Sequence, residues 1–318
     1  MTGTSDFDTS TGLIEITGSA NQTLTGGGSL TAGKVPNIEI DKSGGTLTLS
    51  SIIRLDRWTY TAGTVDATTN DSTIRCCASE TLDGQGTSAT MAFDNVDVGG
   101  STTLGGNLDV DGDLIISGTA GLTTSSSNYS VNVAGNWTIT STSTTAFVSN
   151  SSTVTWDGSS NATMTTGGTG TGYDFQTLTI NKSSSAVATL ATNGLDVDGT
   201  LTISAGVLSL AGLNVTTTTT FSNSDTLRLQ GGETVSWTTN DADSGTYNYV
   251  GDGDSAADTY TVKNFTGADY YHLTFNATDG TTDTFTLGET TDVDGTLTVC
   301  AGYFDVSSSN YGLTVAGG

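Results

Sequence analysis

The sequence predicts an all-β fold, and within that class a parallel β-helix (β-solenoid) built from about four degenerate repeats. The first observation is composition: serine and threonine make up about a third of the chain, with 42 glycines and one proline, so strand-favouring residues are combined with turn-favouring ones. The second observation is a phrase that the chain repeats. The third is the period-two spacing of its apolar residues, with no stretch showing the 3.6-residue period of a helix.

The repeated phrase is LDVDGTLTISAGVLSLAG at 195–212, with close variants LDVDGDLIISGTAGL at 108–122 and TDVDGTLTVCAGYFDV at 291–306. Together with the strand-like phrases that precede it, this phrase divides the chain into repeats. The predicted repeats are 1–70, 71–146, 147–220 and 221–318. The first is degenerate because it lacks DVDG, and the fourth is enlarged by an acidic, tyrosine-rich insert at 240–260.

Within one repeat, apolar residues occur in pairs two positions apart, separated by small or turn-forming residues. This spacing predicts strands of about three to five residues, in coils that each bend about three times and stack about 4.8 Å apart. The residues predicted to point inward in the third repeat are Leu178, Ile180, Val187, Leu190, Leu195, Val197, Leu201, Ile203, Leu208, Leu210, Leu213 and Val215. Tandem β-sandwich (immunoglobulin-like) domains are the alternative, because the later intervals between repeated phrases approach the roughly 100 residues of such a domain.

The charge of the chain limits its partners. The formal net charge is -25, and five of the eight basic residues lie in the first 75 positions. Nucleic-acid binding is not expected, because it requires a clustered basic face. Membrane insertion is not expected either, because no apolar run approaches the roughly 18 residues of a spanning helix. The acidic, hydroxyl-rich composition suits a protein that stays dispersed outside a cell.

The ends of the sequence match the repeat. The first residues have neither the basic region nor the apolar region of a secretory signal, and the chain begins and ends in phase with the repeated phrases. We expect either a segment of a longer array or a protomer whose end is continued by the start of the next protomer.

Aspartates are the candidate metal ligands. Asp109, Asp111 and Asp113 cluster in DVDGD, and Asp252 and Asp254 lie in the acidic insert. Carboxylates at this density suit calcium, although the glutamate that an EF-hand needs near position 12 of its loop is absent. We therefore predict that no cofactor is required and that calcium is the ion these residues would hold.

A repeated surface turn is the alternative explanation for the DVDG aspartates. Strand alternation would place the two aspartates that flank an inward valine on the same outer face, about 7 Å apart. The same arrangement is expected for Asp196 with Asp198 and for Asp292 with Asp294.

No catalytic residue is predicted. The single histidine, His272, is not accompanied by the G-x-S-x-G motif of a serine hydrolase. Basic residues are also missing near the aspartate pairs that a polysaccharide-cleaving β-helix would use. Alternation turns Cys76 inward and leaves Cys77 and Cys300 outward, as free thiols or as partners in an intermolecular disulfide.

Four asparagines in N-x-S/T sequons are predicted glycosylation sites of an exported chain. They are Asn136, Asn150, Asn161 and Asn181.

The phrases GNWTIT, STVTWDGSS, FQTLTINKSS and LDVDGTLTISAGVLSLAG resemble the Gly/Thr-rich tandem repeats of large bacterial cell-surface proteins. More loosely, they are similar to the β-helical shafts of filamentous-haemagglutinin-like adhesins. The resemblance covers nearly the whole chain, but it consists of packing and turn signals. It implies a secreted, cell-surface or extracellular fibrous protein and brings no active site with it.

Two classes of function follow from these observations. The first is a non-enzymatic, extracellular structural or adhesive repeat protein, such as a surface stalk or the subunit of a filament joined head to tail through terminal strands. The second is a carbohydrate-binding or polysaccharide-degrading β-helix protein, for which glycans would be the partners.

Overall fold

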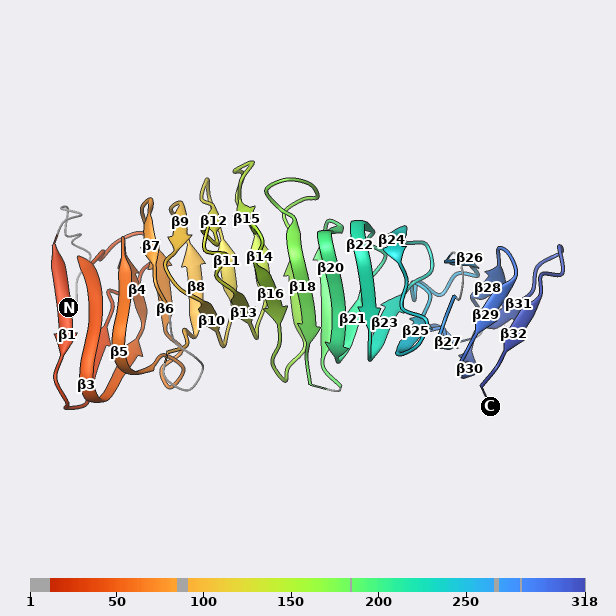
Figure 1. The fold of residues 1–318 in the computed structure, drawn as a ribbon, viewed down its shortest axis with the longest axis horizontal. Helices are drawn as coiled ribbons and strands as arrows, with labels where there is room; N and C mark the ends of the chain where they lie inside the picture. Colours follow the sequence, from red (N-terminus) through yellow and green to blue (C-terminus); the bar gives the residue numbers. More distant parts are fainter. Residues whose placement is uncertain (1–11, 85–90, 184, 266–268, 281, 318) are drawn as a thin grey trace. The chain divides into compact units, whose positions relative to one another are not determined.

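The computed structural model describes residues 12–84, 91–183, 185–265, 269–280 and 282–317. Within these ranges every regular element is a β-strand, and every described pair of strands between coils is parallel (Figure 1). The prediction of a parallel β-solenoid is confirmed, and the sandwich alternative is wrong because sandwiches are built from antiparallel sheets. The chain forms two compact units: unit 1 is Met1–Gly158 with Thr165–Gln176, and unit 2 is Ser159–Met164 with Thr177–Gly318.

Unit 1 contains three ladders of parallel strands. The first ladder has the order β1-β3-β5-β7-β9-β12-β15, with β2 also paired to β3. Its strands are β1 (Leu13–Thr17), β2 (Gln22–Thr25), β3 (Asn37–Ser50), β5 (Trp58–Asp66), β7 (Glu80–Leu82), β9 (Thr102–Leu104), β12 (Leu122–Thr123) and β15 (Phe147–Val148). The second comprises β4 (Ile52–Leu55), β6 (Thr73–Cys76), β8 (Asn95–Val98), β11 (Leu114–Ile116) and β14 (Trp137–Ile139). The third comprises β10 (Leu108–Val110), β13 (Val131–Val133) and β16 (Thr153–Trp156).

From β8 onward the chain visits the three ladders of unit 1 in a fixed rotation. Strands β8, β11 and β14 belong to the second ladder, β9, β12 and β15 to the first, and β10, β13 and β16 to the third. Each coil of this stretch therefore has three strands and three bends, as the spacing of the apolar pairs predicts.

Unit 2 is also built from ladders of parallel strands, but its strands differ in length from those of unit 1. One ladder contains β19 (Val187–Thr192), β21 (Val207–Ser209), β23 (Thr226–Leu229), β25 (Thr246–Tyr249), β27 (His272–Asn276) and β30 (Leu297–Ala301). A second contains β20 (Leu195–Ala205), β22 (Val215–Asn223) and β24 (Val235–Thr239). The last coils form two short ladders, β26 (Thr259–Val262), β28 (Thr284–Leu287) and β31 (Tyr303–Asp305), and β29 (Thr291–Val293) with β32 (Leu313–Val315). Strands β17 (Ala162–Thr165) and β18 (Phe175–Asn181) contain residues of both units.

The core is a set of columns in which one apolar residue from each coil stacks on its register partner. In unit 1, Ile53 pairs with Ile74 and Ile74 with Val96, 21 and 22 residues along the chain. These side chains are at most 1% exposed, and burying each stabilises the fold by about 1.5–3 kcal/mol. In unit 2, Leu227 pairs with Tyr247 and Tyr247 with Leu273, 20 and 26 residues along.

The structural repeat is therefore one coil and not the longer repeat that the DVDG phrase marks. Each predicted repeat of about 70–100 residues contains several coils, because stacking requires only an inward apolar pair at period two. The repeated phrase also changes conformation: DVDG lies inside strand β20 at 196–199, whereas Asp111–Gly112 and Asp294–Gly295 lie at bends after β10 and β29.

Most of the predicted inward residues of 178–215 are buried. The exceptions are Val187 and Leu213, which are half-buried, and it is Ala188 that fills the core position beside Val187. The period-two argument chose the wrong phase here because both neighbouring residues are apolar.

The acidic insert predicted at 240–260 is not a loop outside the solenoid. It contains β25, which pairs with β23 and β27. Tyr247 and Tyr249 point into the core with 0% exposure, where burial raises the pKa of both phenols. The loops of this segment are 240–245 before β25 and 250–258 between β25 and β26, and β25 itself supplies a layer of the core.

Two lysines are buried at equivalent positions after an inward isoleucine. Lys42 follows Ile40 and is 2% exposed, and Lys182 follows Ile180 and is 1% exposed. The ammonium of Lys42 donates hydrogen bonds to the carbonyl of Ala20 at 2.8 Å and to Oε1 of Gln22 at 2.5 Å. Buried ammonium groups require such acceptors.

Candidate functional site

Carboxylates from two successive coils of unit 2 converge at one place. The loop after β25 carries Asp252, and the loop after β27 carries Asp279 and Asp283. Because β25 pairs with β27 and β26 pairs with β28, these loops occupy matching positions in neighbouring coils. One carboxylate oxygen from each of the three residues lies within 4.8 Å of the others. We call Asp252, Asp279 and Asp283 the Asp283 cluster.

The Asp283 cluster runs from solvent to the interior. Asp252 is exposed, Asp279 is half-buried and Asp283 is 0% exposed. Oδ1 of Asp283 accepts a hydrogen bond from the backbone N–H of Asp258 at 3.3 Å. Oδ2 of Asp283 and both carboxylate oxygens of Asp279 are buried and have no hydrogen-bond partner among the described residues.

The electrostatics of the cluster are unfavourable as they stand. Burial raises the pKa of Asp283, and the neighbouring carboxylates of Asp279, Asp252 and Asp258 act in the same direction. Buried anionic oxygens without a donor are costly, and like charges at this separation add repulsion. The arrangement can be relieved by a proton or by a cation.

A glycine lets the loop close over the buried carboxylate. Gly251 has φ +66°, and a Cβ at this position would lie 1.8 Å from Oδ2 of Asp283. Any side chain at 251 would therefore displace the carboxylate that the loop covers.

Of the two insert aspartates predicted as calcium ligands, Asp252 belongs to the Asp283 cluster and Asp254 does not. The structure brings Asp252 and Asp254 together with Asp258, again with oxygens within 4.8 Å, but that group lies at the exposed outer part of the loop. Sequence reasoning missed Asp279 and Asp283, which lie in NATDGTTDTF at 276–285. Their spacing around a Gly-containing turn was the signal available, but their proximity to Asp252 depends on the register of β25 with β27.

The other predicted metal ligands do not converge. No group of three carboxylates within 4.8 Å among the described residues includes Asp109, Asp111 or Asp113. The carboxylate of Asp113 accepts hydrogen bonds from the backbone N–H and the side-chain amide of Asn136, at 2.7 and 3.1 Å. Asp113 therefore joins two coils through a protein donor, since Asn136 belongs to the next coil.

The aspartate pairs of the DVDG phrase do not share one environment. Asp292 and Asp294 are both exposed. Asp198 is exposed, but Asp196 is only 5% exposed, so the prediction of two solvated carboxylates is wrong for that pair. Because DVDG is part of the long strand β20, Asp196 lies within the sheet and not at a bend.

A shallow hollow in unit 2 is the place where an enzymatic function would have to be sought. It has a volume of about 410 Å³, and its lining includes Phe221, Asp241, Asp243 and Asp294. Burial acts to raise the pKa of Asp241, but hydrogen bonds from Asn223, Asp243 and Ser222 bring it below its usual value. The pKa of Asp243 is raised, first by its hydrogen bond with Asp241.

The hydrogen bonds of Asp241 are made with groups of the fold itself. Its oxygens accept the backbone N–H of Asn223 at 2.8 Å and the hydroxyl of Ser222 at 3.2 Å, both at the end of β22. No Arg, Lys or His lines the hollow. We therefore interpret Asp241 and Asp243 as residues that hold the loop after β24 in place.

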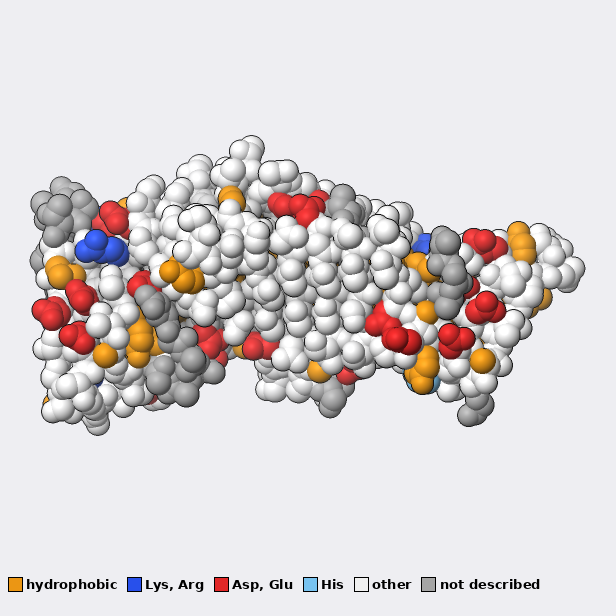
Figure 2. Space-filling model, in the orientation of Figure 1, with side chains coloured by type: hydrophobic (Ala, Val, Ile, Leu, Met, Phe, Trp, Pro, Cys, Tyr) orange, Lys and Arg blue, Asp and Glu red, His pale blue; other side chains and the backbone are white. Residues whose placement is uncertain are grey.

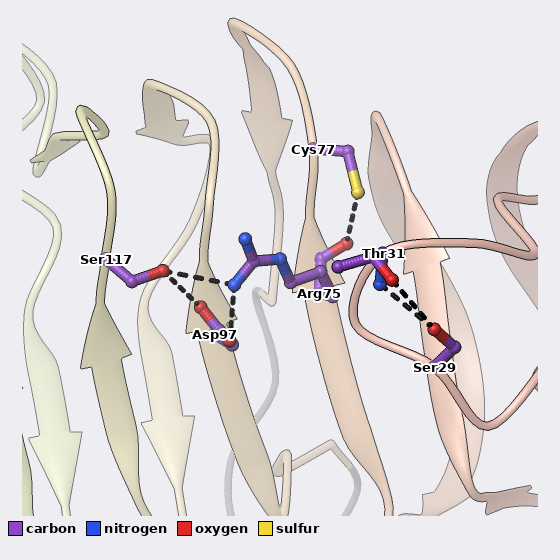
Figure 3. Close-up of polar contacts among 6 residues, drawn as sticks. All are labelled: Ser29, Thr31, Arg75, Cys77, Asp97 and Ser117. Carbon is purple, nitrogen blue, oxygen red and sulfur yellow. Dashed lines mark hydrogen bonds and ion pairs between the residues drawn. The ribbon is translucent and has the colours of Figure 1, made fainter.

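One basic residue of unit 1, Arg75, is tied to the two following coils (Figure 3). The guanidinium of Arg75 on β6 forms an ion pair with Asp97 on β8 and donates to the hydroxyl of Ser117 at 3.1 Å. Ser117, which follows β11, donates to Asp97 at 3.1 Å. Three successive coils are linked by this chain of contacts, which leaves Arg75 paired and not free to bind an anion. On the face drawn in Figure 2, acidic side chains are spread widely and basic side chains are few.

The three cysteines are free thiols. Cys76 is buried and Cys300 exposed, as alternation predicts, and Cys77 is half-buried. Burial raises the pKa of Cys76 to about 12 and also raises that of Cys77. Neither adjacent thiol is activated as a nucleophile, because the thiolate is the reactive form.

The predicted glycosylation sites differ in accessibility. Asn150, Asn161 and Asn181 are exposed, whereas Asn136 is half-buried and its side-chain amide is bonded to Asp113. Attachment of a glycan at Asn136 would have to break that contact. The amide of Asn150 also donates, to the hydroxyls of Thr123 and Thr124 at 3.3 Å, so among the described residues Asn161 and Asn181 are the exposed sites for which no such donated bond has to be broken.

The last coil of unit 2 has an open side. Strands β30, β31 and β32 each have one described neighbour, β27, β28 and β29 respectively. Core columns end there in exposed side chains: Phe275 is 0% exposed, but its register partner Val299 is 49% exposed. In the same way Val293 is 1% exposed and its partner Val315 is 40% exposed. We call Val299 and Val315, with strands β30, β31 and β32, the terminal face.

No protein-family model, curated protein or solved structure matches the chain. Within the described residues no helix is both long enough and apolar enough to cross a membrane. The parallel strand ladders define the class of the protein, a parallel β-solenoid. Its function has to be inferred from the geometry of the acidic clusters and the terminal face.

Proposed function

We propose that the chain is a non-enzymatic structural module of an extracellular or cell-surface fibre, extended at its terminal face by the N-terminal coil of a second copy. The observation that carries this proposal is the exposure of Val299 and Val315 at positions where the preceding coil buries their register partners, Phe275 and Val293. Apolar side chains at this exposure, beside three strand edges that pair with no further described strand, form a template for another coil.

Parallel stacking supports a second copy as the occupant. Successive coils are related by translation along the stack, so the open side of a last coil matches the side that a first coil presents. A contact of this kind is heterologous, and it propagates head to tail. In unit 1, β3 is the described neighbour of β1, and Ile14 on β1 is half-buried although its register partner Ile38 is 0% exposed. Both partners therefore offer a strand edge and apolar surface.

The lack of a convergent catalytic centre also supports a structural role. Among the described residues, the acidic hollow at Asp241 contains no basic partner, the lone His272 accepts a hydrogen bond from the backbone N–H of Thr296 at 2.9 Å, and Arg75 is paired with Asp97. These groups hold coils and loops together and leave no acid, base and charge-stabilising group directed at a common point.

The experiment that tests the proposal follows assembly against concentration, by sedimentation velocity and by negative-stain electron microscopy. We expect the wild-type chain to form ordered, concentration-dependent fibres. A double variant, Val299→Lys with Val315→Lys, should stay monomeric because it places two charges in the contact. Thr274→Lys, on the outer side of β27, is the matched control and should assemble like the wild type.

Two results would contradict the proposal. One is a wild-type chain that remains monomeric over the whole concentration series, and the other is a lysine double variant that assembles as the wild type does. A wild-type chain that instead binds and cleaves polysaccharide, with activity lost in Asp241→Asn, would support the carbohydrate-directed alternative.

A further inference from the structure

We propose that the Asp283 cluster is a calcium site that joins two neighbouring coils of unit 2. The site consists of Asp252 from the loop after β25, and Asp279 and Asp283 from the loop after β27. It goes beyond the structural role proposed above and does not depend on it, because all of its ligands come from one chain.

The buried, unpartnered oxygens point to a missing positive charge. Asp283 is 0% exposed, and its Oδ2 has no hydrogen-bond donor among the described residues. Both carboxylate oxygens of Asp279 are also buried and also lack a described donor. Elsewhere in the chain, half-buried or buried carboxylates are supplied with donors: Asp113 with Asn136, and Asp97 with Arg75 and Ser117. A single carboxylate oxygen without a donor also occurs at Asp56, whose other oxygen pairs with Lys34. Among the described residues, Asp279 is the aspartate that has both oxygens buried without a donor, and it lies beside the fully buried Asp283.

The dimensions of the cluster suit calcium. Calcium binds six to eight oxygens at about 2.3–2.6 Å, so ligand oxygens across the ion lie up to about 5 Å apart. The three carboxylates offer oxygens within 4.8 Å of one another, and bidentate binding or water would complete the shell. Magnesium needs a tighter octahedron at about 2.0–2.1 Å and keeps more of its own water.

The site has a buried side and an open side. Asp283 forms its floor beneath Gly251, while Asp252 at the exposed side leaves a path from solvent. Tyr260 lies beside it, with a hydrogen bond to Asp252, and its pKa is raised first by burial and then by Asp252 and Asp283. The ring of Tyr260 can therefore report on an ion bound at the cluster.

The consequence is a cation-dependent link near the end of the solenoid. Asp252 precedes β26 and Asp283 precedes β28, so an ion shared between them fixes two coils that otherwise touch through strand pairing. Binding to the folded state alone stabilises it by mass action. The coils from β25 to β28 should be more resistant to unfolding when calcium is bound.

The test uses the purified full chain after removal of divalent ions with a chelator. Terbium luminescence excited through tyrosine reports binding, and isothermal titration with calcium chloride or magnesium chloride gives affinity and stoichiometry. We expect terbium to saturate a site at this cluster, calcium to displace it, and magnesium to displace it at least tenfold less well. Asp283→Asn and Asp279→Asn should each weaken calcium binding at least tenfold.

Controls separate loss of the site from loss of the fold. Asp252→Asn changes an exposed ligand and should weaken binding while leaving the circular dichroism spectrum unchanged, even if Asp283→Asn fails to fold. Asp294→Asn, an exposed aspartate of the same unit, should bind calcium as the wild type does. The inference is overturned if the wild type shows no saturable calcium binding at millimolar concentration, or if Asp252→Asn and Asp279→Asn both bind with wild-type affinity.

Discussion

The aromatic column of unit 2 allows a quantitative test of how the terminal coil is packed. The ring of Phe275 on β27 is fully buried and contacts the rings of Tyr249 at 5.7 Å, Phe285 at 5.1 Å and Phe304 at 5.0 Å between centroids. The ring of Phe304 on β31 lies in the last coil, is half-buried, and has Phe275 as its described aromatic partner.

Replacing these two residues should therefore have unequal effects. Phe275→Ala removes a fully enclosed ring and should lower the free energy of unfolding by about 3–5 kcal/mol. Phe304→Ala removes a ring with one side open, so we expect about half of that loss. For a unit of this size the larger change corresponds to a fall in Tm of roughly 6–20 °C.

The assay is thermal and urea unfolding followed by circular dichroism, at a low protein concentration chosen to suppress the assembly proposed above. Hydrogen exchange of β27 and β30 adds spatial resolution, because the end of a solenoid opens before its middle. Equal losses for the two variants would refute the reasoning, since they would mean that Phe304 is as enclosed in solution as Phe275. So would a loss below about 1 kcal/mol for Phe275→Ala, which is incompatible with a ring in the core.

Three further changes test the contacts between coils. Burial raises the pKa of Asp94 from its ordinary 3.8 to about 6. Between these two pH values the folded state keeps a proton on Asp94 that the unfolded state has released. The stability that the protonated carboxyl contributes is complete below pH 3.8 and is lost as the pH rises through 6. Asp94→Asn should therefore flatten the pH dependence of urea unfolding between pH 4 and 6, and an unchanged slope would count against this assignment. Asp97→Asn removes the charge that pairs with Arg75 and should cost about 1–3 kcal/mol in chemical unfolding, less at high salt; a double-mutant cycle with Arg75→Ala that gives no coupling energy would contradict it. Gly206→Ala should cost at least about 1 kcal/mol, because Gly206 has φ +81° and a Cβ would lie 2.6 Å from Cβ of Lys182; an unchanged Tm would show that the backbone relaxes there.

The sequence was sufficient to predict the fold class because its signal is local. A solenoid coil is made of short strands and tight bends, and each is specified by a few neighbouring residues: apolar residues at period two, then Gly, Asn or Asp. This is why Leu178, Ile180, Leu201 and Ile203 could be assigned to the core, and all four are buried. The same argument failed at Val187 because Ala188 is also apolar, and only packing selects between two such phases.

The candidate site, in contrast, depends on the tertiary structure. Asp252 and Asp254 are conspicuous in the sequence as an acidic run, but Asp279 and Asp283 acquire their significance only from the pairing of β25 with β27, which sets residues of two loops side by side. Likewise, nothing local distinguishes Val299 from Phe275, and the exposure of Val299 follows from the absence of a described strand beyond β30. Local pattern determines that a residue faces the core, whereas the register between coils and the position of the coil in the stack decide what that residue meets there.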